Sequence, residues 1–102
     1  MIYELGDKVA NFVQQMKPNP KPRKEVMQFA HVMENQLLAN EHKGRWEKEH
    51  WCDLASDLER NVLTLRKELM KKGIDCNILE VTKRCANIAN YAMMIAGNEG
   101  ND

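Results

Sequence analysis

Several features that would assign a function directly are missing from this sequence. Lys and Arg together number 15, as do Asp and Glu, so the formal net charge is zero and nothing predicts binding to a nucleic acid polymer. No run of about 18 apolar residues is present, and Met1 to Lys8 lack the basic and apolar regions of a signal peptide. We therefore expect a soluble, cytoplasmic protein with no membrane partner.

Cysteine and histidine are scarce and are not spaced as metal ligands. The three cysteines, Cys52, Cys76 and Cys85, are odd in number and contain no Cys-x-x-Cys pair. The three histidines show no zinc-site spacing either. This pattern favours free thiols in a reducing compartment and predicts no zinc site.

The composition that remains is that of one small helical domain. Hydrophobic residues make up 43% of the 102 residues and charged residues 29%, which suits a globular chain with a modest core. Apolar residues recur three and four apart, with almost no period of two, and this predicts an all-α fold. We expect one domain over 1–102, with a helix over 1–16, a stiff connector rich in Pro and Lys over 17–24, and a helical core over 25–97.

The clearest helical pattern lies in the second half of the chain. It predicts helices over about 48–72 and 76–97, each with one apolar seam. Gly73 suits the end of the first helix, and Asp75 suits the N-terminal cap of the next. Because the link is then only a few residues long, the two helices should be antiparallel neighbours. A shorter helix should precede them, from about Glu25 to Asn40, with Phe29, Met33 and Leu37 facing the core.

A polar stripe runs beside the apolar seams of this predicted hairpin. With the turn centred near Ile74, residues on the two helices pair off across the hairpin. The predicted pairs are Thr64 with Arg84, Asn61 with Asn87, Glu68 with Glu80, and Asp57 with Tyr91. We expect any binding chemistry to lie in this stripe.

Two segments resemble a known family. Residues 40–46 read Asn-Glu-His-Lys-Gly-Arg-Trp, and residues 89–96 read Ala-Asn-Tyr-Ala-Met-Met-Ile-Ala. Both resemble segments of the MazG-like all-α nucleotide pyrophosphohydrolases, including short phage and prophage dATP/dGTP pyrophosphohydrolases. The resemblance covers about Phe29 to Gly97. It implies a four-helix MazG-like fold, a homodimer or homotetramer with Met93 and Met94 at a subunit interface, and a phage-encoded protein in the host cytoplasm.

The resemblance also shows what has been replaced. Family members hold Mg²⁺ with Glu-Glu-x-x-Glu on one helix and Glu-x-x-Asp on the next, because carboxylates one turn apart converge on hard cations. The matching positions here are Arg60, Asn61, Thr64, Arg84 and Asn87. Every expected carboxylate is absent, and two positions carry a permanently charged guanidinium that matches phosphate.

The leading hypothesis is a catalytically inactive relative that binds or sequesters a phosphorylated nucleotide, including a cyclic or modified nucleotide used as a defence signal. Arg60 and Arg84 would supply the positive charge that Mg²⁺ supplies in the enzymes. The predicted nucleotide-binding residues are Lys43, Arg45, Trp46, Arg60, Asn61, Thr64, Arg84, Asn87 and Tyr91. No catalytic residue, metal ligand or cofactor is predicted.

Alternative interpretations stay open at this point. Arg84 lies four residues after Glu80 and would then bridge Glu80 and Glu68 in a purely structural cluster, while Arg60 would point into solvent. Trp46 and Trp51 would be core or interface anchors. Two other functions remain: an Mg²⁺-dependent nucleoside triphosphate pyrophosphohydrolase with displaced carboxylate ligands, and a protein-binding module that inhibits a host protein.

Overall fold

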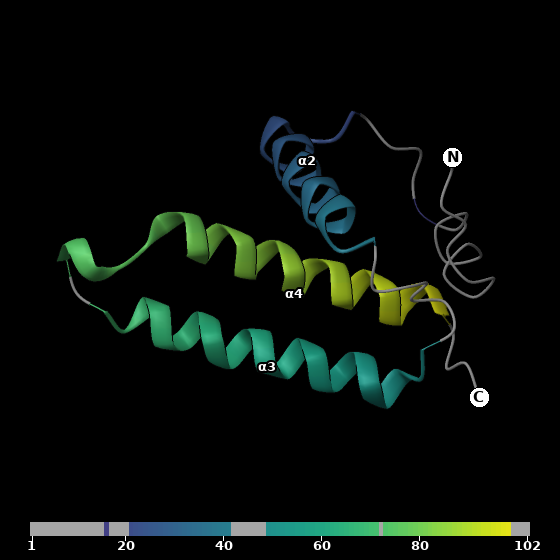
Figure 1. Ribbon diagram of the computed structural model, residues 1–102. Helices are drawn as coiled ribbons and strands as arrows, with labels where there is room; N and C mark the ends of the chain where they lie inside the picture. Colours follow the sequence, from purple (N-terminus) through teal and green to yellow (C-terminus); the bar gives the residue numbers. More distant parts are fainter. Residues whose placement is uncertain (1–15, 17–20, 42–48, 72, 99–102) are drawn as a thin grey trace.

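The computed structural model describes residues 16, 21–41, 49–71 and 73–98. Within these ranges the chain forms three α-helices and one 3₁₀ helix, with no strand, which confirms the all-α prediction (Figure 1). The elements are α2 (Lys24–Ala39), α3 (Trp51–Leu69), η3 (Gly73–Asp75) and α4 (Ile78–Asn98). None of the helices in the described ranges is long and apolar enough to cross a membrane. Apart from Met16, the helix predicted over 1–16 lies outside the described residues.

Helices α3 and α4 run antiparallel and side by side, as predicted (Figure 1). Helix α2 crosses α4 and packs mainly against it. Its bounds lie within one residue of those predicted, and its expected core-facing residues Phe29, Met33 and Leu37 are half-buried. Helix α4 therefore holds both other helices, and any site shared by the three must be built around it.

The bounds of α3 are narrower than predicted because capping groups close both ends. His50 precedes the helix, and its Nδ1 accepts the backbone N–H of Cys52 at 3.0 Å. At the other end Met70 is the C-cap, so the helix stops before Gly73. Gly73 adopts φ of +60°, a left-handed conformation that strains other residues, and opens the 3₁₀ turn that reverses the chain.

The predicted cap of α4 is wrong. Asp75 belongs to η3, and it is Asn77 that caps the helix by accepting the N–H of Glu80 on Oδ1 at 3.2 Å. The link between the helices is longer than expected because residues 73–75 form a turn of their own. Asn77 lies where the helix begins, which leaves Asp75 too far upstream to reach its free N–H groups.

Polar contacts tie the hairpin at both ends. At the closed end, the backbone N–H of Asn77 donates to Oε2 of Glu68 at 2.7 Å. At the open end, Trp51 Nε1 donates to the carbonyl of Ile95 at 3.0 Å. The Asn98 side chain also donates to the carbonyl of Glu49, at 2.7 Å. These bonds link residues far apart in sequence and set the register of α3 against α4.

The apolar core is small. Among the described residues, Leu54 and Ala86 are the only fully buried apolar ones. Two polar side chains are buried beside them, Glu68 with 7% and Asn90 with 3% of their surface exposed. Within the described ranges, the polar contacts between the helices therefore add to a core that contains few fully buried apolar side chains.

Removing the Asn77 cap should lower stability. We expect Asn77→Ala to reduce the free energy of unfolding by about 1 kcal/mol, since the Glu80 N–H loses its acceptor. Urea denaturation followed by circular dichroism measures the change. Asn77→Ser keeps a capping oxygen and is the matched control. Equal stabilities of Asn77→Ala and the wild type would contradict this assignment.

Candidate functional site

Three of the five positions at which the resemblance leads us to expect carboxylates meet between α3 and α4. Arg84 Nη1 donates to Oδ1 of Asn61 at 3.1 Å, and Asn87 Nδ2 approaches the same oxygen at 3.4 Å. Asn61 faces this way because its own Nδ2 donates to the carbonyl of Asp57 at 2.8 Å. The predicted pairing of Asn61 with Asn87 is thus confirmed. Oδ1 of Asn61 is the acceptor for both side chains from α4.

Arg84 is also bound to a carboxylate on its own helix. Its Nε donates to Oε1 of Glu80 at 2.8 Å, with 33% of the Arg84 and 31% of the Glu80 side chain exposed. The ion pair expected from the four-residue spacing is therefore present. It neutralises the guanidinium, but Nε and one Nη1 proton account for only two of its five N–H groups. Within the described residues the other three donate no hydrogen bond, so they can meet an external acceptor.

Two other predicted pairings across the hairpin do not form. The hydroxyl of Thr64 donates to the carbonyl of Arg60 in its own helix at 3.0 Å, while Arg84 contacts Asn61. Glu68 pairs with Lys71 and the Asn77 backbone, so no Glu80–Arg84–Glu68 bridge exists. The contact of Asn61 with Asn87 keeps the register expected from a turn centred near Ile74, even though the link is longer than expected.

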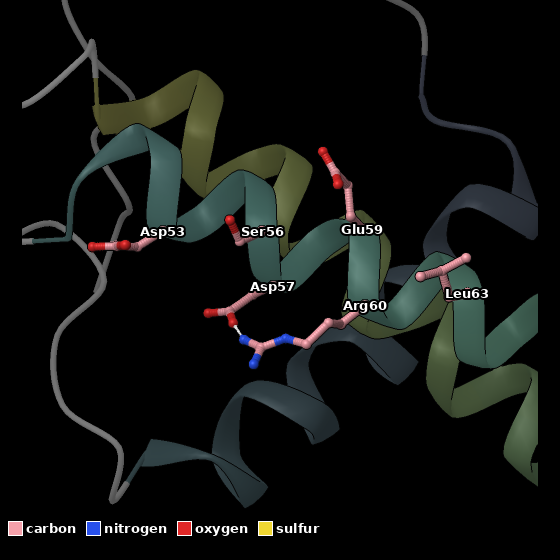
Figure 2. A pocket seen from close by; sticks show the side chains of 6 residues that line it. All are labelled: Asp53, Ser56, Asp57, Glu59, Arg60 and Leu63. Atoms are coloured by element: carbon pink, nitrogen blue, oxygen red, sulfur yellow. Dashed lines mark ion pairs between the residues drawn. The ribbon is translucent and has the colours of Figure 1, made fainter.

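Arg60 lies apart from Arg84, and the expectation that the two guanidinium groups share one cleft needs correction. Its side chain is 73% exposed and pairs with Asp57. Arg60 lines a shallow hollow of about 370 Å³ on the outer surface of α3 (Figure 2). The residues lining this hollow are Asp53, Ser56, Asp57, Glu59, Arg60 and Leu63. Three carboxylates and one guanidinium line this hollow, so the local charge disfavours a phosphate.

Four other predicted site residues fall in different places. Tyr91 is half-buried on α4, seven residues beyond Arg84 and so on nearly the same face. Lys43, Arg45 and Trp46 lie outside the described residues. Of the predicted site residues that are described, Asn61, Arg84 and Asn87 come together. We call these three the hairpin amide cluster, and Glu80 is bound to it.

The hairpin amide cluster does not fit Mg²⁺. The ion needs oxygen ligands, usually carboxylates, whereas the cluster presents a guanidinium and two amides that are already hydrogen-bonded. Among the described residues no three His, Cys, Asp or Glu side chains gather as a metal site. Glu80 is bound to Arg84, and both oxygens of Glu68 are bound to other groups, so the displaced ligands considered above do not converge.

Asn90 is absent from the residues predicted to form the site, yet it is the most buried polar side chain described. Its Nδ2 donates to the carbonyl of Met33 in α2 at 3.0 Å. The sequence does contain a signal, since the amide of Asn90 interrupts a mostly apolar stretch over 88–96. That signal does not indicate which neighbour the amide meets.

No family model, curated protein or solved structure matches this chain. The contacts of its own side chains are therefore the basis for a proposed function.

The Glu68 carboxylate should make stability depend on pH. The backbone N–H of Asn77, and then the Lys71 ammonium, hold the pKa of Glu68 below its ordinary value of 4.5, although burial opposes this. A carboxylate with a lowered folded-state pKa stabilises the fold above the unfolded-state pKa, and this contribution is lost as the pH falls through the folded-state value.

We therefore expect the denaturation midpoint to fall between about pH 6 and pH 3, and to fall less in Glu68→Gln. Thermal unfolding at the two pH values measures the difference. The exposed Glu59→Gln is the control for removing a carboxylate from α3. An unchanged pH dependence in Glu68→Gln would refute the assignment.

Proposed function

We propose that this chain binds a phosphorylated nucleotide without hydrolysing it. The observation that carries the proposal is the hydrogen bond from Arg84 Nη1 to Asn61 Oδ1, which holds a guanidinium between α3 and α4. The resemblance to MazG-like pyrophosphohydrolases puts metal-binding carboxylates at these same positions, where the metals neutralise nucleotide phosphates. A fixed arginine offers the same charge to the same group, which supports capture of such a ligand.

Arg84 is well suited to bind a phosphate. Its guanidinium cannot lose its charge, and its planar set of donors matches two phosphate oxygens at once. Asn61 and Glu80 hold the side chain in one orientation before any ligand arrives, so little side-chain freedom is lost on binding. Asn61 acts here as a positioning residue. It would therefore act on the ligand through Arg84, and not as one of the residues that contact the ligand directly.

Arg60 is left out of the proposed phosphate site. Arg60 pairs with Asp57 much as Arg84 pairs with Glu80, but two further carboxylates, Asp53 and Glu59, line the same hollow and make its net charge negative. Binding therefore depends on one arginine in place of the two expected from the sequence.

Capture without cleavage follows from the donor set of the hairpin amide cluster. Hydrolysis in the family uses metals that activate the attacking water, and the cluster has no carboxylate to hold them. A ligand bound by Arg84 would be retained and would release no product. We propose that such a protein sequesters its nucleotide, and that its ligands include cyclic nucleotides used as defence signals against phage.

Titration calorimetry in EDTA tests the binding directly, with mono-, di-, tri- and cyclic nucleotides. We expect saturable binding without metal that weakens as salt is added. Arg84→Gln should weaken it at least about 10-fold, because a charge-assisted hydrogen bond is lost. Arg66→Gln removes the same charge from an exposed position of α3 and should have little effect. The proposal fails if no nucleotide binds or if the two variants behave alike.

A variant at Glu80 distinguishes nucleotide binding from nucleotide hydrolysis. Because Glu80 competes with a phosphate for Arg84, Glu80→Gln should tighten nucleotide binding. If the chain is instead a pyrophosphohydrolase with displaced ligands, wild-type protein with Mg²⁺ should release pyrophosphate from dATP, dGTP or dUTP, and Glu80→Gln should abolish the release. Assaying both properties on the same variant decides between the two functions.

A second candidate function, protein binding, is favoured by a group of exposed apolar side chains at the closed end of the hairpin. This apolar tip consists of Leu69, Met70, Ile78 and Leu79, with exposures of 57%, 75%, 72% and 63%. A surface of this kind typically marks an interface. Since so few apolar residues are buried within one chain, we propose that the tip contributes to a homodimer or homotetramer.

Sedimentation measurements test this association. We expect a mass of two or four chains of 11.8 kDa each. Lysine in place of both Met70 and Ile78 should shift the mass toward one chain, because burying an ammonium in an interface is costly. Leu63→Lys, at an exposed apolar residue away from the tip, should leave the mass unchanged. A monomeric wild type would instead leave the tip available to another protein.

A further inference from the structure

One buried polar atom has no partner in the described part of the chain. Asn90 is 3% exposed, and its Oδ1 is buried without any hydrogen bond, although its Nδ2 donates to the Met33 carbonyl. More than nine-tenths of buried polar groups in folded proteins are paired, because an unpaired one has lost its water without compensation. An amide oxygen of this kind is ready to accept a donor from a bound molecule.

The contact with α2 sets the direction of this oxygen. The carbonyl of Met33 can only accept, so the amide must turn Nδ2 toward α2 and Oδ1 away from that carbonyl. Reversing the amide would place two acceptors against each other. The orientation is therefore enforced, and the acceptor is preorganised in the way that a recognition group needs to be.

Asn90 continues the polar stripe of the hairpin amide cluster. Asn87 follows Arg84 by three residues and Asn90 follows Asn87 by three, and side chains at this spacing are neighbours on a helix. The stripe turns gradually from α3, which Asn87 contacts, to α2, which Asn90 contacts. Six residues of helix rise by about 9 Å, which is the scale of one nucleotide from its phosphate to its base.

Helix α2 covers Asn90 and is only lightly held. None of its side chains is fully buried, and it packs mainly on α4. In the described residues, the side-chain hydrogen bond that joins it to α4 is the one from Asn90 itself. A shift of α2 that keeps the Met33 contact would open space beside Oδ1 of Asn90 without disrupting the α3–α4 hairpin.

We propose that Oδ1 of Asn90 recognises the base of the bound nucleotide by accepting a hydrogen bond from a base N–H, either an exocyclic amino group or a ring imino group. This inference rests on the proposed nucleotide binding. Arg84 holds the phosphate, and Asn90 distinguishes a nucleotide from a sugar phosphate that lacks the donor.

Matched ligands test the proposal on the wild-type protein. The pairs are AMP with N6,N6-dimethyl-AMP, CMP with N4,N4-dimethyl-CMP, and UMP with N3-methyl-UMP, and ribose 5-phosphate serves as the ligand without a base. For the nucleotide that binds, we expect its methylated counterpart and ribose 5-phosphate to bind at least about 10-fold more weakly, because the buried oxygen is then left unpaired.

Variants assign the effect to Asn90. Asn90→Leu should bind the unmodified nucleotide about 10-fold more weakly than the wild type does. Its affinities for the methylated counterpart and for ribose 5-phosphate should equal those of the wild type. Arg84→Gln should lower the affinity for all of these ligands by a similar factor. Circular dichroism establishes that each variant is folded, and the methylated ligands give the answer on the wild type if Asn90→Leu does not fold.

The outcomes separate this inference from the proposed function. Equal binding of methylated and unmodified nucleotides overturns the role of Asn90 and leaves nucleotide binding standing. Discrimination that persists in a folded Asn90→Leu also overturns it. Absence of binding by every ligand removes both proposals.

Discussion

The side-chain amide of Asn61 is the constraint on which the rest of the site depends. Its Nδ2 is held by the Asp57 carbonyl, so its Oδ1 must face α4, where Arg84 and Asn87 meet it. A guanidinium between two helices is tolerated only when its charge and donors are satisfied, and Glu80 provides the opposite charge. Each group of this cluster is thus oriented by another. The result is an arginine fixed in place with donors to spare, which is the property that a phosphate site requires.

The fold around this cluster is held together more by specific polar contacts than by a large core. The bonds from Trp51 to Ile95 and from Asn77 to Glu68 tie the hairpin at its two ends, while Leu54 and Ala86 are the only apolar residues fully buried in the described ranges. Helix α2 adds cover over α4 but buries no side chain completely. The hairpin leaves apolar side chains exposed at its closed end, and α2 lies beside the buried amide of Asn90. Both features suit a binding protein more readily than a rigid structural one.

Much of the fold could be predicted from the sequence, but less of the site. The three helices and the antiparallel hairpin follow from apolar spacing, and the contact between Asn61 and Asn87 follows from the hairpin. The position of Arg60 could not be derived in the same way. It is adjacent to Asn61 and so lies about 100° around the helix from it. From there its long side chain can contact groups on a neighbouring helix or groups on α3 itself. Only the structure shows that Arg60 forms an ion pair with Asp57, which lies one turn earlier on α3.

The amino-acid sequence alone determined where the helices form and which face of each is apolar, because these depend on residue type and on a local period of 3.6 residues. Tertiary structure decided which polar groups pair. The cap of α4 is Asn77 where the sequence predicted Asp75, and Arg84 contacts Asn61 where Thr64 was predicted. One oxygen of Asn90 has no donor among the described residues. Such choices depend on how far the helices slide and rotate against each other, and that is set by packing across the whole chain.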